Sequence, residues 1–125
     1  MEIITTYFFD SYAFFEIIEG NQNYDPYSQD VGIITSKLNL MEVHYGLLNK
    51  YGKEIADRYY DRLLPFTIDL DDDIIKSANM IKLLFKKRDL SYVDCIGYTL
   101  AKARHVKFLT GDKQFEDLEN VEFVK

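Results

Sequence analysis

The most constraining feature of the sequence is a predicted helix that leads directly into a predicted strand, with an aspartate near each end. This unit occupies residues 91–115 and reads SYVDCIGYTLAKARHVKFLTGDKQF. Ser91 is a favourable N-cap, and the apolar residues after it recur at helical spacing. The β-prone run at 106–110 then predicts a strand. About fourteen helical residues at roughly 1.5 Å each nearly match about five strand residues at roughly 3.3 Å plus a turn, so we expect Asp94 and Asp112 to meet at one edge.

The rest of the chain alternates predicted strands and helices. Strands are predicted at residues 2–9, 31–35, 66–68 and 121–124, and helices at 11–19, 39–50, 54–64 and 71–87. The polar stretch 20–30 predicts a loop or a single helical turn. This alternation is typical of an α/β fold with a central parallel sheet and helices on both faces. With 125 residues, 47% of them hydrophobic, we expect one domain spanning residues 1–125.

Four acidic residues fall at the carboxyl edge of the predicted sheet, where ligands bind in open α/β folds. Asp10 directly follows the first strand, and Asp112 follows the strand that ends at Thr110. Glu42 and Asp94 lie in the predicted first turns of two helices. The topology therefore predicts that all four carboxylates converge.

Each of these acids also has a simpler explanation within its own element. Asp10 suits a helix N-cap, Asp112 suits a turn, Glu42 has capping-box spacing after Asn39, and Asp94 has the same spacing in its helix. Four carboxylates at one edge nevertheless repel each other unless a cation binds there. Magnesium and manganese prefer hard oxygen ligands and keep bound water that can act as a nucleophile. The cluster therefore predicts a Mg²⁺ or Mn²⁺ site.

The composition excludes several kinds of metal site and binding partner. The single cysteine, Cys95, rules out an internal disulfide framework, and two histidines without a cysteine pair argue against structural zinc. No apolar run is long enough to cross a membrane, so we expect a cytoplasmic protein without a membrane partner. The net charge of −6 argues against strong nonspecific adhesion to nucleic acid, because that attraction depends on basic side chains. A nucleic-acid substrate would need cations between itself and this chain.

Four motifs together resemble the PIN-domain family, including toxin ribonucleases of the VapC type, over essentially the whole chain. They are Tyr7-Phe8-Phe9-Asp10-Ser11, Asn39-Leu40-Met41-Glu42, Ser91-Tyr92-Val93-Asp94 and Leu109-Thr110-Gly111-Asp112-Lys113-Gln114-Phe115. The resemblance implies strand order 3-2-1-4-5 and a metal-dependent endoribonuclease that acts on RNA, pairs with an antitoxin and uses Mg²⁺ or Mn²⁺. It implies the following site residues: Asp10, Glu42, Asp94 and Asp112 as catalytic and metal-binding residues, Asp117 as an auxiliary ligand, and Ser11 and Thr110 as supporting residues.

Other conspicuous side chains have structural interpretations. The acidic run at 69–73 is interpreted as a solvated helix start, where acids complement the helix dipole. His44 is expected to point away from Glu42 on the same helix. The basic run at 86–88 is interpreted as a solvated helix end. Lys113, next to Asp112, is the basic residue that we expect to contact a substrate phosphate.

The predicted helix at 11–19 carries apolar side chains around most of its circumference. They are Tyr12, Phe14, Phe15, Ile17 and Ile18. This pattern predicts a groove for an amphipathic antitoxin segment or a homodimer surface, unless both sides of the helix are buried within the domain.

Two other classes of function compete with the nuclease prediction. One is a PIN-like scaffold module that binds RNA or protein without catalysis, and this alternative stays open. The other is a phospho-accepting receiver domain, which also carries acids at strand ends. It needs a paired acid after the first strand and a lysine after the last strand, and neither Asp10-Ser11 nor residues 121–125 supply that pattern.

Overall fold

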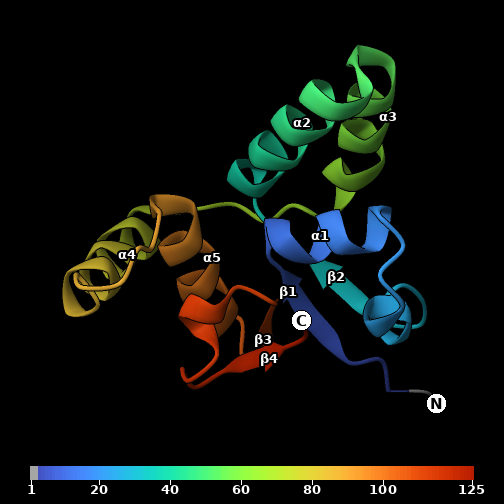
Figure 1. The fold of residues 1–125 in the computed structure, drawn as a ribbon. Helices are drawn as coiled ribbons and strands as arrows, with labels where there is room; N and C mark the ends of the chain where they lie inside the picture. The colour runs from blue at the N-terminus through green and yellow to red at the C-terminus, as the bar shows by residue number, and fades with distance from the viewer. Residues whose placement is uncertain (1–2) are drawn as a thin grey trace.

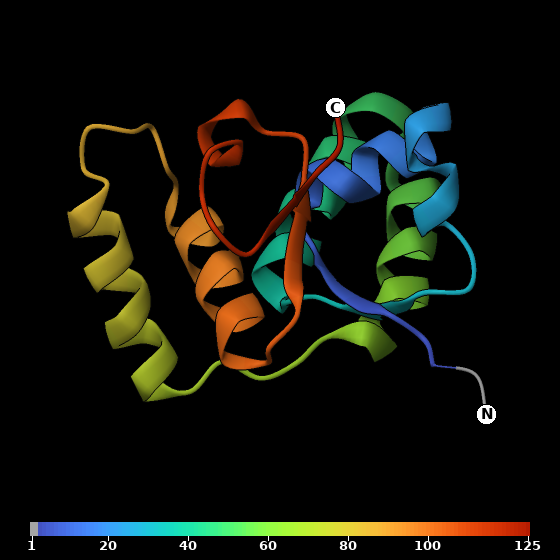
Figure 2. The same cartoon turned by 90° about the horizontal axis from the view of Figure 1, so that it is seen from below.

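A four-stranded parallel sheet lies between two groups of helices in the computed structural model, which describes residues 3–125 (Figures 1 and 2). The strands are β1 (Thr6–Phe9), β2 (Gly32–Ile34), β3 (Lys107–Thr110) and β4 (Val121–Phe123), in the order β2-β1-β3-β4. Each neighbouring pair is parallel. The predicted α/β fold with helices on both faces is therefore confirmed.

The sheet has four strands rather than the five that were predicted. The missing one is the run at 66–68, where a single parallel bridge joins Thr67 to Thr35. The cause is local, because Pro65 lies in a 3-10 turn, η2 (Leu64–Phe66), which leaves little chain to extend beside β2. The bridge nevertheless lies on the outer side of β2, so the order of the other strands agrees with 3-2-1-4-5.

The first strand is also shorter than predicted. Its pairing begins at Thr6, opposite Gly32, and the side chains of Ile3 and Ile4 are exposed. Residue 2, which was included in the predicted strand, lies outside the described residues. The parallel pairing still brings the ends of β1 and β3 together, since Asp10 N–H donates to Leu109 O at 3.0 Å.

Helices connect the strands and cover the sheet. They are α1 (Ser11–Ile18), α2 (Lys37–Tyr51), α3 (Lys53–Leu63), α4 (Asp72–Leu84) and α5 (Tyr92–Ala103), with 3-10 turns η1 (Gln22–Tyr27) and η3 (Lys113–Phe115). Helix α5 begins with the expected capping box of Ser91 and Asp94. Asp71 is the N-cap of α4, and its side chain accepts the N–H of Ile74, so the acids here form a helix start as predicted. None of the helices in residues 3–125 is long and apolar enough to cross a membrane.

Helix α2 begins earlier than predicted. Its N-cap is Ser36, whose hydroxyl accepts the N–H of Asn39 at 3.2 Å. Asn39 is therefore inside the first turn, and Glu42 lies one turn further along. The alternative in which Asn39 and Glu42 form a capping box is wrong, because a better N-cap residue stands three positions upstream.

The alternation of side chains along the strands divides the core into two parts. Phe8 and Phe108 point to one face, where their rings stack at 5.8 Å and pack against α5 and α4. Phe9 and Leu109 point to the other face and pack against α1, α2 and α3. Both layers are thus anchored on the two central strands, whose carboxyl ends carry Asp10 and Thr110.

Most of the apolar surface of α1 is covered within the domain. Phe14 is buried, and Phe15, Ile17 and Ile18 are half-buried. A cavity of about 470 Å³ remains beside this helix, between it and α3. Exposed apolar side chains on other helices include Met41, Tyr45 and Leu48 on α2, and Met80, Leu83 and Leu84 on α4.

Candidate active site

The candidate site begins with Asp10 at the carboxyl end of β1. Only 4% of this residue is exposed. It holds the N-cap position of α1, but its side chain makes no capping hydrogen bond there. Its Oδ2 instead accepts a 2.7 Å hydrogen bond from the hydroxyl of Thr110, at the end of β3. The simple N-cap explanation therefore does not account for this carboxylate.

Thr110 joins two of the predicted site residues. Its buried hydroxyl donates to Asp10 and accepts the backbone N–H of Asp112 at 3.1 Å. Because a hydroxyl has one hydrogen, this arrangement fixes its orientation. Thr110 therefore sets the distance between β1 and the turn that carries Asp112.

Ser11 holds the third carboxylate. Its hydroxyl donates to Glu42 Oε1 at 2.6 Å and accepts from Asn39 Nδ2 at 3.0 Å. Asn39 is fully buried, and its Oδ1 also accepts from Ser36 at 2.6 Å. Sequence analysis did not predict this positioning role of Asn39. The available signal was its spacing of three residues from Glu42, which puts both side chains on one helical face.

The remaining two carboxylates are each held by a backbone N–H. Asp94 Oδ2 accepts from Ser91 N at 2.9 Å, and Asp112 Oδ1 accepts from Gln114 N at 3.0 Å. Each acid thus serves its own turn, as the simpler explanations predicted. These backbone N–H groups engage one oxygen of each carboxylate, Asp94 Oδ2 and Asp112 Oδ1. A structural role and a ligand role are therefore compatible here.

Burial and mutual repulsion act on these acids together. Burial raises the pKa of Asp10 to about 7; the Thr110 hydrogen bond opposes this shift, and the charges of Asp94 and Glu42 add to it. Burial also raises the pKa of Asp94, against its hydrogen bonds with Ser91 and with added repulsion from Asp112 and Glu42. The four carboxylates therefore lie close enough to influence each other's ionisation.

The types of donor atom at this edge suit a hard divalent cation. They are carboxylate and hydroxyl oxygens, which Mg²⁺ and Mn²⁺ prefer, and they include a buried carboxylate that a cation would return to its charged form. Across residues 3–125, however, no group of three or more His, Cys, Asp or Glu side chains is arranged so that it could hold a metal ion.

The profile of the PIN domain matches residues 7–121 of this chain. The chain belongs to the PIN-domain family. The match covers all four predicted acids, from Asp10 to Asp112. The family resemblance inferred from the four motifs is thus confirmed. A sequence comparison with curated proteins finds no match.

Solved toxin structures share the fold of this PIN domain. A toxin–antitoxin complex from Klebsiella pneumoniae superposes with a TM-score of 0.76 at 19% identity, covering 93% of this chain and 95% of that one. VapC20 of Mycobacterium tuberculosis, a toxin that cleaves the sarcin-ricin loop, gives 0.77 at 17% identity, covering 97% and 100%. DNA-bound VapBC from Salmonella typhimurium gives 0.70 at 16% identity, covering 97% of each chain.

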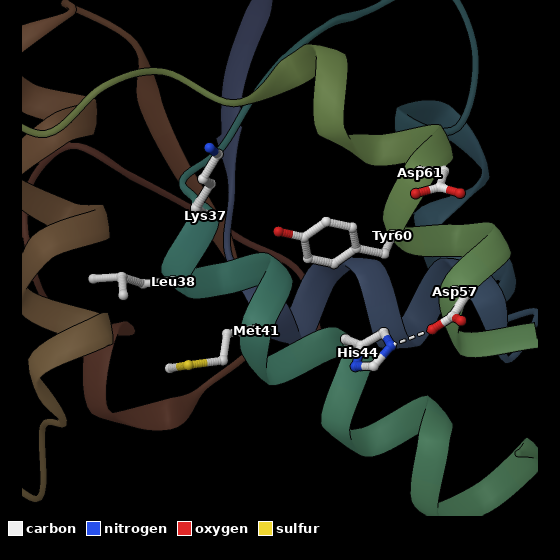
Figure 3. Close-up of a pocket in the computed structure, with 7 residues that line it drawn as sticks. All are labelled: Lys37, Leu38, Met41, His44, Asp57, Tyr60 and Asp61. Carbon is white, nitrogen blue, oxygen red and sulfur yellow. Dashed lines mark hydrogen bonds and ion pairs between the residues drawn. The ribbon is translucent and has the colours of Figure 1, made fainter. Parts of the chain in front are cut away.

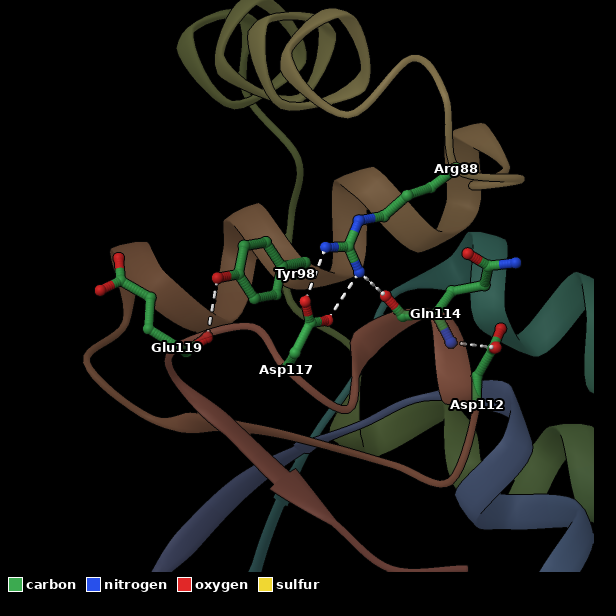
Figure 4. Close-up of polar contacts among 6 residues, drawn as sticks. All are labelled: Arg88, Tyr98, Asp112, Gln114, Asp117 and Glu119. Carbon is green, nitrogen blue, oxygen red and sulfur yellow. Dashed lines mark hydrogen bonds and ion pairs between the residues drawn. The ribbon is translucent and has the colours of Figure 1, made fainter.

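Asp117, the expected auxiliary ligand, lies in a different set of contacts. Both of its carboxylate oxygens accept hydrogen bonds from Arg88, at 2.7 and 2.9 Å (Figure 4). Each oxygen thus carries one hydrogen bond from Arg88, and a ligand role of Asp117 stays a prediction. Lys113 is exposed and adjacent to Asp112, so its contact with a phosphate stays a prediction.

A cavity of about 590 Å³ lies between α2 and α3 of the PIN domain (Figure 3). His44 faces α3 there and pairs with Asp57 at 2.7 Å, which confirms that it points away from Glu42. Met41 lines this cavity and also a second one, of about 540 Å³, whose walls include Ser11 and Glu42. An apolar depression therefore adjoins the carboxylate of Glu42.

Proposed function

We propose that this PIN domain is a metal-dependent endoribonuclease that hydrolyses phosphodiester bonds in RNA, and that it is the toxin of a toxin–antitoxin pair. The observation that carries the proposal is the Thr110 hydroxyl between Asp10 and Asp112, at an edge that also holds Glu42 and Asp94. Four acids crowded at one sheet edge are unfavourable unless they serve a cation. An RNA substrate would put this activity in the cytoplasm.

The proposed ligands of Mg²⁺ or Mn²⁺ are Asp10, Glu42, Asp94 and Asp112. When bound, such an ion lowers the pKa of coordinated water and neutralises charge on the reacting phosphate. The chain's own contribution is orientation. Thr110 holds one oxygen of Asp10, Ser11 holds one oxygen of Glu42, and backbone N–H groups hold the other two acids.

The same carboxylates explain how an acidic chain can accept an anionic substrate. With a net charge of −6, this domain would repel RNA at the site without a cation. Lys113 is exposed beside Asp112 and is our candidate for a direct phosphate contact. Its role is to hold the substrate strand, not to take part in the bond cleavage.

An antitoxin is the partner that we propose for the exposed apolar side of α2. Met41 and Tyr45 are 56% and 72% exposed, and both line the depression that reaches Glu42. An amphipathic segment laid over this surface would cover apolar area and obstruct the carboxylates at the same time. The similar structures from Klebsiella pneumoniae and Salmonella typhimurium are themselves a toxin–antitoxin complex and a VapBC complex. A homodimer stays a prediction, which light scattering of the isolated domain would test.

The decisive experiment measures cleavage of a single-stranded RNA in Mn²⁺, in Mg²⁺ and in EDTA. Asp94→Asn should reduce the rate about a hundredfold or more, because it weakens a ligand while an amide oxygen can still serve the capping box. The matched control is Asp72→Asn, an exposed acid in the first turn of α4, which should cleave like wild type. Full activity of Asp94→Asn would show that Asp94 is not a ligand of the catalytic metal. RNA binding without any cleavage would favour the scaffold alternative.

A further inference from the structure

Arg88 connects two segments that are far apart in the sequence. It follows α4, and its guanidinium lies 5.0 Å above the ring of Phe85. One nitrogen, Nη1, donates to the backbone oxygen of Gln114 and to Asp117 Oδ1, both at 2.7 Å. The other, Nη2, donates to Asp117 Oδ2 at 2.9 Å. Figure 4 shows the guanidinium between the connection that precedes α5 and the segment around η3.

Gln114 connects Arg88 to the candidate site through two hydrogen bonds of its backbone. Arg88 holds its carbonyl oxygen, and its own N–H donates to Asp112 Oδ1 at 3.0 Å (Figure 4). Asp112 is in turn fixed at its N–H by Thr110. The carboxylate of Asp112 is therefore two hydrogen bonds away from the guanidinium of Arg88.

The turn that carries Asp112 needs such support. Helix η3 has three residues, Lys113–Phe115, which is too short to be stable through its own hydrogen bonds. Phe115 anchors it in the core, with no exposed area. Arg88 is the polar anchor, and it holds the segment at both Gln114 and Asp117.

An exposed ion pair alone would carry little weight, because such pairs contribute little to stability. The contact of Arg88 differs in two respects. The fork-shaped guanidinium binds a carboxylate through two parallel hydrogen bonds, which fixes direction as well as distance. It also binds a backbone oxygen, which a change of rotamer at Asp117 cannot remove. Lysine could not reproduce this arrangement.

We propose that Arg88 is a positioning residue for Asp112, and that Asp117 acts by holding Arg88 instead of by binding metal. The guanidinium fixes the segment from Asp112 to Asp117 and so sets the direction of the Asp112 carboxylate toward the other acids. The inference rests on the proposed function, since it concerns the geometry of that metal site. It also gives Arg88 a role that its place in a basic run did not predict.

The test measures the Mn²⁺ concentration that gives half-maximal RNA cleavage, together with the rise in melting temperature that Mn²⁺ causes. Arg88→Gln should raise the half-maximal concentration about tenfold, with much of the rate restored at saturating Mn²⁺. Arg88→Lys, which keeps the charge, should still show a clear increase. Arg58→Gln removes an exposed ion pair with Glu54 on α3 and should behave like wild type. A wild-type Mn²⁺ dependence in both Arg88→Gln and Arg88→Lys overturns the inference.

A double-mutant cycle separates the two roles of Asp117. If Asp117 acts through Arg88, the pair Arg88→Gln with Asp117→Asn should be no worse than the more impaired single variant. If Asp117 is an independent ligand, the two effects should multiply, and our assignment is wrong. Because Asp117 is exposed, Asp117→Asn should fold even where Arg88→Gln does not.

The two readouts also separate this inference from the proposed function. A wild-type protein that binds Mn²⁺ but cleaves no RNA would remove the nuclease proposal, and the melting-temperature shifts of the Arg88 variants would still decide the positioning role. A wild-type protein that shows neither cleavage nor an Mn²⁺-induced shift would remove both, since there would be no metal site for Arg88 to support.

Discussion

Thr110 donates a hydrogen bond of 2.7 Å to Asp10, although the two residues lie 100 positions apart in the chain. They are neighbours because β1 and β3 are adjacent parallel strands that end at the same edge. Both residues are buried, so the hydroxyl is the main polar group that counters the cost of a charged Asp10. This contact links the stability of the sheet edge to the chemistry proposed for it.

Replacing Thr110 by Val should impair activity through the ionisation of Asp10. Valine has a similar shape but removes the hydrogen bond that lowers the pKa of Asp10, so this pKa should rise further. At a subsaturating Mn²⁺ concentration, the acid limb of the pH–rate profile should move to higher pH. Thr110→Ser keeps the hydroxyl and is the matched control. An unchanged profile in Thr110→Val would show that the hydroxyl does not tune Asp10.

The metal-free protein should lose stability as the pH rises from 5 to 8. Because the pKa of folded Asp10 is raised from 3.8 to about 7, the folded state binds more protons than the unfolded state in this interval. The stabilising contribution is fully present below the unfolded pKa and is lost as the pH passes the folded pKa. The free energy of unfolding in EDTA should fall by about 3 kcal/mol between pH 5 and pH 8. Urea denaturation at both pH values measures this change.

Asp10→Asn is the control for this pH dependence. This variant should lose most of the decrease in the free energy of unfolding between pH 5 and 8. A smaller decrease should remain because of Asp94, whose pKa is also raised by burial. The depressed pKa values of Asp57, Asp117 and Glu119 affect stability mainly below this interval, because their folded and unfolded values both lie in the acidic range. A wild-type stability that increases from pH 5 to 8 would mean that folded Asp10 is already ionised at pH 5.

The close contact between α5 and the sheet predicts a cost for a larger residue at Gly97. A Cβ atom there would lie 2.9 Å from Phe8 and 3.0 Å from Phe108, both of them buried rings. Gly97→Ala should therefore destabilise the protein by about 1–3 kcal/mol, although alanine favours helix formation. Gly46→Ala is a useful comparison, since its new methyl group meets the end of the half-buried Phe15 ring. Urea denaturation should give the smaller loss for Gly46→Ala, because that ring can move.

Local sequence patterns predicted those features that depend on a single segment of the chain. The capping box of Ser91 and Asp94 was predicted from spacing alone, and the position of Asp10 after β1 followed from the direction of parallel strands. The run at 66–68 was predicted as a strand because its residues are β-prone, but the 3-10 turn at Pro65 left only one bridge.

Contacts between side chains that are far apart in the chain could not be predicted from the sequence. Arg88 stands in a run of basic residues at a helix end, which is typical of a solvated surface, yet it pairs with Asp117, 29 residues later. Asn39 looked like an N-cap, but besides its local hydrogen bonds with Ser36 its side chain donates to Ser11, 28 residues earlier. Single-segment patterns contain no information about which distant side chain fills such a position. Ser11 and Thr110 were expected as supporting residues from the family resemblance, and Ser91 from its cap spacing, but the contacts of Asn39 and Arg88 were not predicted.

Adding Mn²⁺ should raise the melting temperature of the wild-type protein. Burial and, to a lesser extent, mutual repulsion raise the pKa values of Asp10 and Asp94 in the folded state, and both costs of charging are relieved by a bound cation or by unfolding. An ion at about a hundred times its dissociation constant stabilises by roughly 2.7 kcal/mol if it binds only the folded state. Thermal melts in EDTA and over a Mn²⁺ titration measure the effect.

Asp94→Asn should have opposite effects on the two forms of the protein. It removes a charge that repels Asp10, Glu42 and Asp112, while the amide oxygen can still accept the N–H of Ser91. The metal-free variant should therefore melt at the same temperature as wild type or higher. Its gain on adding Mn²⁺ should shrink, because one ligand is weaker. If Mn²⁺ raised the melting temperature of both proteins equally, the ion would bind elsewhere, for instance at the acidic start of α4, and the four carboxylates would not be the metal site.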